Sequence, residues 1–198
     1  MNKKIKNILS KTYVIGGSPC SGKSTMAEMI AHNHNIKYFK IDDYERKHLE
    51  KSNPEKHPVM YQWSQMSWDQ LWMRSIDLQV KEEFQFYRER LGMIIMEGVA
   101  LLPELVNKLN LGKEQVIFMI PSRKFQVSHY SQRDFIKDIL SECSQPQKAF
   151  INWMERDHLF GKKIKKQAEK IGYKVLRIDG KKKIKENFKL VSEHFGLE

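Results

Sequence analysis

The stretch from Gly17 to Ser24 constrains this chain more than any other. It reads Gly-Ser-Pro-Cys-Ser-Gly-Lys-Ser and fits the pattern G-x-x-x-x-G-K-[ST] of a phosphate-binding loop. Glycine at the two fixed positions permits backbone angles that a Cβ forbids, so that successive N–H groups can turn toward one anion. The lysine supplies positive charge for the β- and γ-phosphates of a nucleotide, and the last serine hydroxyl can ligate Mg²⁺.

The surroundings of this loop fit the same interpretation. Residues 13–15 are typical of a buried strand that enters the loop, and residues 25–31 are typical of a helix that leaves it. Lys23 is therefore predicted to be catalytic, and Ser24 to bind the metal. The residues predicted to contact the nucleotide are Gly17, Ser18, Cys20, Ser21, Gly22, Lys23, Ser24 and Thr25.

Carboxylates follow two further apolar segments. Residues 36–41 are predicted to form a strand that ends in Asp42 and Asp43, and residues 93–96 a central strand that ends in Glu97. Ligands of α/β sheets bind at the carboxyl ends of the strands. We expect Asp42, the acid next to its strand, to be the general base, although Asp43 stays an alternative, and Glu97 to support Mg²⁺. Turn or capping roles are the alternative for the two aspartates.

The remaining periodic segments alternate between the strand and helix patterns. Ser67 and Gln70 match a capping box, and an apolar stripe from 68 to 91 predicts one helix of about six turns. Pro146 and Gly172 are typical first and stop residues of a helix. The expected strands are 13–15, 36–41, 93–96, 115–120 and 174–178, and the later helices are 103–109, 146–171 and 184–195.

The composition limits the other function classes. The chain has 198 residues, of which 40% are hydrophobic, and these values suit a single α/β domain. Apolar runs of membrane-spanning length and a signal peptide are not found, so we expect no membrane partner. The two cysteines, Cys20 and Cys143, favour a cytoplasmic location, and no spacing indicates zinc.

Positive charge is concentrated near the C-terminus. The whole chain carries a formal net charge of +11, and residues 161–185 contain eleven basic and two acidic residues, so their net charge is +9. Such a segment is compatible with nucleic acid, an anionic membrane surface or a phosphorylated substrate, or with a solvated helix face. Aromatic residues that would stack on bases are largely missing there, which makes a nucleic-acid partner a weak prediction.

The chain resembles small P-loop kinases of the nucleoside/nucleotide and shikimate/gluconate kinase group over nearly its whole length. The motifs that carry this resemblance are Gly17 to Ser24, Ile41-Asp42-Asp43, Glu97-Gly98, Arg133 and Asp179-Gly180. The segment from Glu97 to Pro103 and the pairs Arg133-Asp134 and Arg156-Asp157 are similar to 2-phosphoglycerate kinases and zeta-toxin-like kinases.

This resemblance implies an α/β P-loop NTPase fold with a five-stranded parallel sheet in the order 2-3-1-4-5. It implies one domain over residues 1–198, with a helical lid at about 123–161 between the fourth and fifth strands. Arginines of such a lid close over the phosphates. Arg133 is the implied catalytic arginine and Arg156 the next candidate for nucleotide binding, with Arg123 as a third.

The predicted function is ATP- and Mg²⁺-dependent transfer of the γ-phosphate to a small-molecule acceptor. Residues 44–66 match no segment that would identify the acceptor. The alternatives are an ATPase switch protein and a polynucleotide-type kinase. An Asn-Lys-x-Asp motif for guanine is not found, which disfavours a GTPase.

Overall fold

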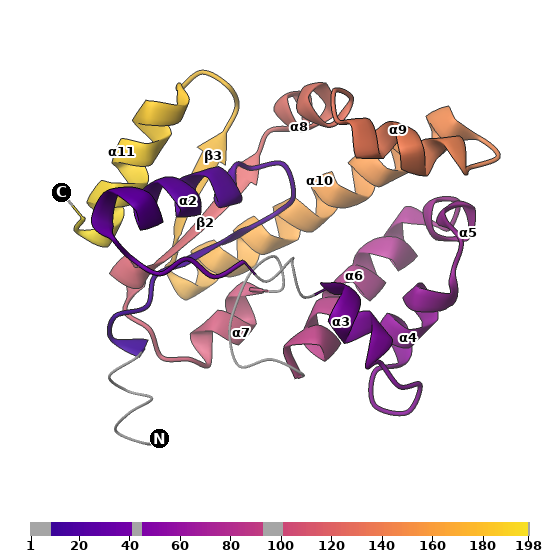
Figure 1. The fold of residues 1–198 in the computed structure, drawn as a ribbon, viewed down its shortest axis with the longest axis horizontal. Helices are drawn as coiled ribbons and strands as arrows, with labels where there is room; N and C mark the ends of the chain where they lie inside the picture. Colours follow the sequence, from indigo (N-terminus) through magenta and orange to yellow (C-terminus); the bar gives the residue numbers. More distant parts are fainter. Residues whose placement is uncertain (1–8, 41–44, 93–100, 198) are drawn as a thin grey trace.

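In the part of the chain that the structure describes, the sheet has three parallel strands in the order β1-β2-β3 (Figure 1). The computed structural model describes residues 9–40, 45–92 and 101–197. Within them the strands are β1 (Val14–Gly17), β2 (Val116–Pro121) and β3 (Lys174–Ile178). All six residues of β2 are buried, as expected of the central strand of a parallel sheet.

The predicted five-stranded sheet in the order 2-3-1-4-5 is therefore wrong. Residues 36–40 form no strand, and their exposure alternates between half-buried and exposed. Phe39 is 43% exposed, so this segment lacks the burial on both faces that parallel strands require. The predicted strand 93–96 lies outside the described residues, as does Ile41. The three strands that are present correspond to the first, fourth and fifth predicted ones.

The described helices connect and cover these strands. Helix α10 runs from Pro at its first position to a left-handed Gly172, as the sequence predicts. The helices are α2 (Lys23–His34), α3 (Glu45–Glu50), α4 (Pro58–Gln65), α5 (Trp68–Trp72), α6 (Ile76–Gly92), α7 (Pro103–Asn107), the 3₁₀ helix η2 (Lys113–Gln115), α8 (Arg123–Tyr130), α9 (Asp134–Ser141), α10 (Pro146–Ile171) and α11 (Ile184–Phe195).

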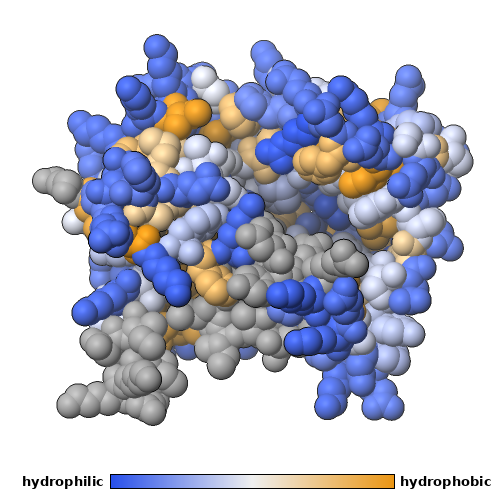
Figure 2. Space-filling model, viewed as in Figure 1, coloured by the Kyte–Doolittle hydropathy of each residue, from blue (hydrophilic) through white to orange (hydrophobic). Residues whose placement is uncertain are grey.

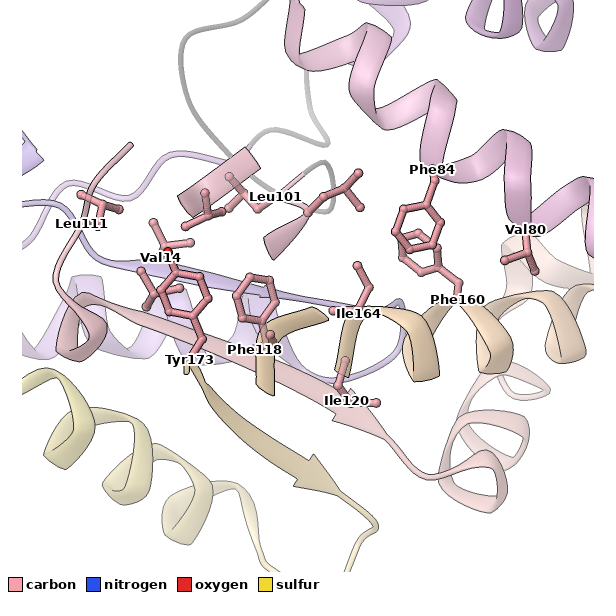
Figure 3. Packing of buried hydrophobic residues seen from close by; sticks show 14 of the residues in the cluster. Val14, Val80, Phe84, Leu101, Leu111, Phe118, Ile120, Phe160, Ile164 and Tyr173 are labelled. Atoms are coloured by element: carbon pink, nitrogen blue, oxygen red, sulfur yellow. The ribbon is translucent and has the colours of Figure 1, made fainter. Parts of the chain in front are cut away.

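Alternate residues of β2 enter two different apolar cores. Val116 and Phe118 belong to one core with residues of α6, α7 and the second half of α10, in which the rings of Phe84 and Phe160 have centroids 4.9 Å apart (Figure 3). Ile117, between them, packs on the other face with residues of α2 and α11. The sheet is thus the middle layer between two layers of helices.

A third apolar cluster holds the helices that lie beyond the carboxyl ends of the strands. We call α5, α8, α9 and the first half of α10 the helical lobe. Its core contains Trp72, Trp153 and Tyr130, together with Cys20 of the glycine-rich loop. The predicted lid segment, 123–161, covers α8, α9 and the first part of α10, and α10 continues without a break onto the sheet. The lobe is therefore joined to the loop by apolar packing.

The single helix predicted over 68–91 is wrong, because α5 ends at Trp72 and α6 begins at Ile76. The fully buried Gln79 side chain donates hydrogen bonds to the carbonyls of Trp72 (3.3 Å) and Arg74 (2.8 Å). These bonds satisfy carbonyl groups that the helix end leaves without a partner. The capping box of Ser67 and Gln70 is confirmed at the start of α5.

Within the described ranges, none of the helices combines the length and the apolar character that crossing a membrane requires.

Candidate functional site

The glycine-rich loop joins the end of β1 to the start of α2. Gly17 has φ +124°, and a Cβ there would lie 2.0 Å from the Met119 carbonyl oxygen of the neighbouring strand. Gly22 has φ +81°, and Cys20 is also left-handed with φ +60°. The loop therefore needs glycine at both motif positions, for strand packing at the first and for backbone conformation at both.

Lys23 stands at the mouth of this loop. Its Nζ donates to the Ser18 carbonyl oxygen (2.7 Å) and approaches Ser21 Oγ (3.5 Å), and Ser21 Oγ donates to the same carbonyl (2.9 Å). Helix α2 begins here without a side-chain cap on Gly22 and without an acidic residue in its first turn. The positive end of the helix, its first N–H groups and the ammonium together favour an anion at this point.

The predicted nucleotide-binding residues divide into a buried and an accessible group. Lys23 and Ser24 are half-buried, whereas Gly22 and Thr25 are exposed, so the start of α2 can be reached from solvent. The side chains of Ser18, Cys20 and Ser21 are buried, and these residues would contact a ligand through the backbone. The lysine, the serine hydroxyl and the left-handed loop residues fit a Mg²⁺ nucleotide.

Helix α10 packs directly against the loop. A Cβ on Gly161 would lie 2.9 Å from Ser18 Oγ and 3.3 Å from Ser18 Cβ, so only glycine lets the helix come this close. The Ser18 hydroxyl is buried and has no hydrogen-bond partner among the described residues. The position of the loop is thus coupled to the position of α10.

Arg133 belongs to the helical lobe and lies beside the loop. Its Nη2 lies 3.8 Å from Cys20 Sγ, and its guanidinium is 5.1 Å from the centre of the Tyr130 ring. The residue is exposed, and no ion pair joins it to a carboxylate among the described residues. Burial raises the pKa of the Cys20 thiol, and the Arg133 charge opposes that rise. An arginine beside the loop that has no carboxylate partner in the described part of the chain fits the predicted phosphate contact.

The other two predicted arginines are already paired. Arg123 Nη2 lies 2.7 Å from Glu155 Oε2. Arg156 is buried and donates to Asp157 Oδ1 from Nε (3.0 Å) and Nη2 (2.6 Å), and its Nε is 3.4 Å from Glu83 Oε2. Of the three predicted arginines, Arg133 is therefore the one whose charge is open to a ligand in the described part of the chain.

The buried cluster of Glu83, Arg156 and Asp157 was not predicted. Its guanidinium stacks on the Trp72 ring at 4.5 Å, and Trp72 stacks on Trp153 with centroids 4.3 Å apart. A signal was present in the sequence, because Asp157 interrupts the apolar stripe of Trp153, Phe160 and Ile164 along α10. A charge inside such a stripe must be paired or neutral once it is buried.

The two carboxyl groups of this cluster have raised pKa values. Burial raises the pKa of Glu83 to about 8, against the opposing effects of Arg156 and of a hydrogen bond from Tyr87. Burial also raises the pKa of Asp157, which Arg156 and the facing Tyr130 hydroxyl lower again. One arginine is thus shared by two buried acids, and Glu83 is the one that keeps its proton near neutral pH.

The predicted acids Asp42, Asp43 and Glu97 lie outside the described residues, as does Gly98. Ser24 is the one member of the predicted metal set that the structure places. The described residues contain no group of three or more His, Cys, Asp or Glu side chains that could hold a metal ion. Asp179 Oδ1 accepts from the Lys181 N–H (3.1 Å), and Gly180 has φ +83°, so this predicted motif forms the turn after β3.

The face seen in Figure 2 is hollowed near its centre, between the α2 side of the molecule and the α5 and α6 side. A separate open pocket of about 390 Å³ lies between α3 and α4, where Leu49 and Glu50 face Tyr61 and Ser64. None of its lining residues belongs to the stretch Gly17 to Ser24.

Comparison with known proteins gives no relative. The chain matches no protein-family model, no curated protein and no solved structure.

Proposed function

We propose that this protein is a phosphotransferase that moves the γ-phosphate of ATP to a small-molecule acceptor. The observation that carries the proposal is the loop from Gly17 to Ser24, which connects a parallel strand to the uncapped start of α2. Its left-handed residues and Lys23 provide the N–H groups and the charge that a triphosphate needs. The sequence resemblance to small P-loop kinases supports the same reaction.

The chain's own residues would act mainly by positioning and by charge. Lys23 would exchange its bond with the Ser18 carbonyl for contacts to the β- and γ-phosphates. Arg133, exposed beside the loop, would approach the transferring group and neutralise its charge in the transition state. Mg²⁺, when bound through Ser24 and the predicted Glu97, would neutralise further phosphate charge.

The bond changes of this reaction are simple. An acceptor oxygen attacks the γ-phosphorus, the bond from that phosphorus to the β–γ bridging oxygen breaks, and ADP leaves. The acceptor's proton goes to a carboxylate, for which Asp42 is our candidate from the sequence. The positive charge of Lys23 and Arg133 favours an acceptor that is anionic or rich in hydroxyl groups.

The test is a screen for ADP release with a panel of hydroxylated metabolites, phosphorylated metabolites and nucleosides, run beside Lys23→Ala. The proposal predicts a strong stimulation by one class of small molecule, lost in the variant. Hydrolysis that no acceptor stimulates would favour an ATPase switch. Selective stimulation by oligonucleotides would favour the polynucleotide kinase.

A further inference from the structure

The cluster of Glu83, Arg156 and Asp157 joins three elements of the fold. Glu83 comes from α6, Arg156 and Asp157 come from α10, and Trp72 of α5 covers the guanidinium. Glu83 and Asp157 are each 1% exposed and Arg156 is 6% exposed. Asp157 Oδ2 has no hydrogen-bond partner among the described residues, and Glu83 Oε2 has only the 3.4 Å approach of Arg156 Nε.

The same cluster is adjacent to the phosphate-binding loop. Asp157 and Gly161 are four residues apart on α10, hence one turn apart on the same face. Gly161 is the residue that abuts Ser18 of the loop. Cys20 of the same loop packs in the apolar core with Trp72 and Trp153. A shift of α10 at Asp157 would therefore be transmitted to the loop through both contacts.

We propose that Glu83, Arg156 and Asp157 act as a positioning cluster, which holds the phosphate-binding loop in its binding geometry only while the two acids together carry a single negative charge. This inference rests on the proposed function for its nucleotide readout, and it has a second readout that does not. The three residues touch no reacting atom in this account, so they are positioning residues.

The positioning depends on the balance between the one positive charge of Arg156 and the negative charges of Glu83 and Asp157. One guanidinium can balance one buried carboxylate, and here it makes two hydrogen bonds to Asp157 Oδ1. If Glu83 also ionises, a second negative charge is left at a buried position away from bulk solvent. It would compete with Asp157 for Arg156, separate α6 from α10, and repel the phosphates at the loop.

The proton on Glu83 is the one that changes in the accessible pH range. Its pKa is raised to about 8 by burial, whereas the pKa values of Cys20 and Tyr130 are raised above their usual values of 9 and 10. The groups that face the cluster are Tyr87 on α6, Tyr130 on α8, and Cys20 and Lys23 at the loop, while Arg133 faces Cys20 and Tyr130.

The first experiment measures the dissociation constant of ATP at pH 7 and pH 9 for the wild type, Glu83→Gln and Asp157→Asn. A loop that binds only in the protonated state loses affinity about tenfold between these pH values, because the competent fraction falls from about nine tenths to one tenth. Glu83→Gln removes the titrating group, and Asp157→Asn leaves one acid for one arginine. Both variants should lose most of the tenfold change.

Glu169→Gln on the exposed side of α10 is the matched control and should keep the tenfold change. Titration of the nucleotide and of other groups is common to all four proteins. An equal pH dependence in the wild type and in both variants would overturn the proposal. An ATP affinity of the wild type that does not change between pH 7 and pH 9 would also overturn it.

The second experiment needs no nucleotide. In a Cys143→Ser background Cys20 is the single thiol, so its alkylation rate reports how firmly the loop packs on the helical lobe. The ratio of the wild-type rate to the Glu83→Gln rate should rise several-fold from pH 7 to pH 9, since thiol ionisation is shared. A constant ratio contradicts the cluster proposal. If the protein does not bind ATP but the rate ratio still rises with pH, the proposed kinase function is wrong and the positioning cluster is supported.

Discussion

Arg133 and Cys20 meet where the helical lobe reaches the glycine-rich loop, with Arg133 Nη2 3.8 Å from Cys20 Sγ. The arginine is exposed and lacks a carboxylate partner among the described residues, although two other arginines of the same segment are paired. A guanidinium in this position can turn to a bound triphosphate without breaking an ion pair. It is the clearest candidate for charge stabilisation during transfer.

Arg133→Ala should therefore lower kcat by about 100-fold, because loss of one transition-state donor costs roughly two to three orders of magnitude. KM for ATP should change much less. Arg123→Ala is the matched control: its guanidinium is held by Glu155, and we expect less than about a threefold change in kcat. Steady-state kinetics of both variants check this, and equal losses would exclude a special role for Arg133.

Gly161→Ala should displace α10 from the loop. The added Cβ would lie 2.9 Å from Ser18 Oγ, and overpacking of this kind costs about 1–3 kcal/mol of unfolding free energy. Adding Ser18→Gly removes both Ser18 atoms that the Cβ meets and leaves Ile120 at 3.5 Å, an ordinary contact. Chemical denaturation should thus show partial recovery of stability in the double variant. Additive losses would contradict the contact.

Arg156→Ala should destabilise the fold by about 3–5 kcal/mol, since it leaves two buried carboxyl groups without their shared partner. Arg133→Ala, at an exposed position, should change the free energy of unfolding by less than about 0.5 kcal/mol. Urea titrations of the two variants give the comparison. If the Arg156→Ala protein is as stable as the wild type but binds ATP more weakly, Arg156 acts as the lid arginine that the sequence resemblance implied.

The free energy of unfolding should depend on pH through Glu83. Its pKa is raised from 4.5 to about 8 in the folded state, so between these values the folded protein keeps a proton that the unfolded chain releases. Stability therefore falls as pH rises through this window, by up to about 1.4 kcal/mol per pH unit, and levels off above it. Glu83→Gln should lack this term. The measurement is the difference between the two stability curves from pH 5 to pH 9, and parallel curves would refute the assignment.

Much of the fold followed from patterns that act locally. The apolar runs that became β2 and β3 were predicted, and so was α10, because Pro146 and Gly172 fix its ends through backbone geometry. The loop at Gly17 to Ser24 was predicted for the same reason, since its glycines are required by the conformation itself.

The errors came from interactions that a pattern of apolar residues does not encode. The break between α5 and α6 is stabilised by Gln79 and by Asn152, whose Nδ2 donates to the Trp72 carbonyl (2.8 Å) across 80 positions of the chain. The spacing of apolar residues along the chain does not predict these hydrogen bonds. Residues 36–40 alternate in the way a strand does, yet they have no partner strand among the described residues.

In the candidate site, too, local features could be predicted from the sequence and contacts between distant residues could not. Lys23 and its loop could be named from eight consecutive residues, whereas the pairing of Arg156 with Glu83 joins helices 73 positions apart. Sequence position alone made Arg156 and Arg133 look alike as lid arginines. Burial and charge pairing, which depend on packing, separate them.

The central claim is that the loop from Gly17 to Ser24 binds the phosphates of ATP. Calorimetric titration of Mg²⁺·ATP into the wild type, Lys23→Ala and the exposed control Lys165→Ala tests it most directly. The account predicts one site in the wild type and in Lys165→Ala, and at least tenfold weaker binding in Lys23→Ala, with all three proteins folded by circular dichroism. Equal ATP affinity in Lys23→Ala and the wild type, or binding by neither, would contradict it.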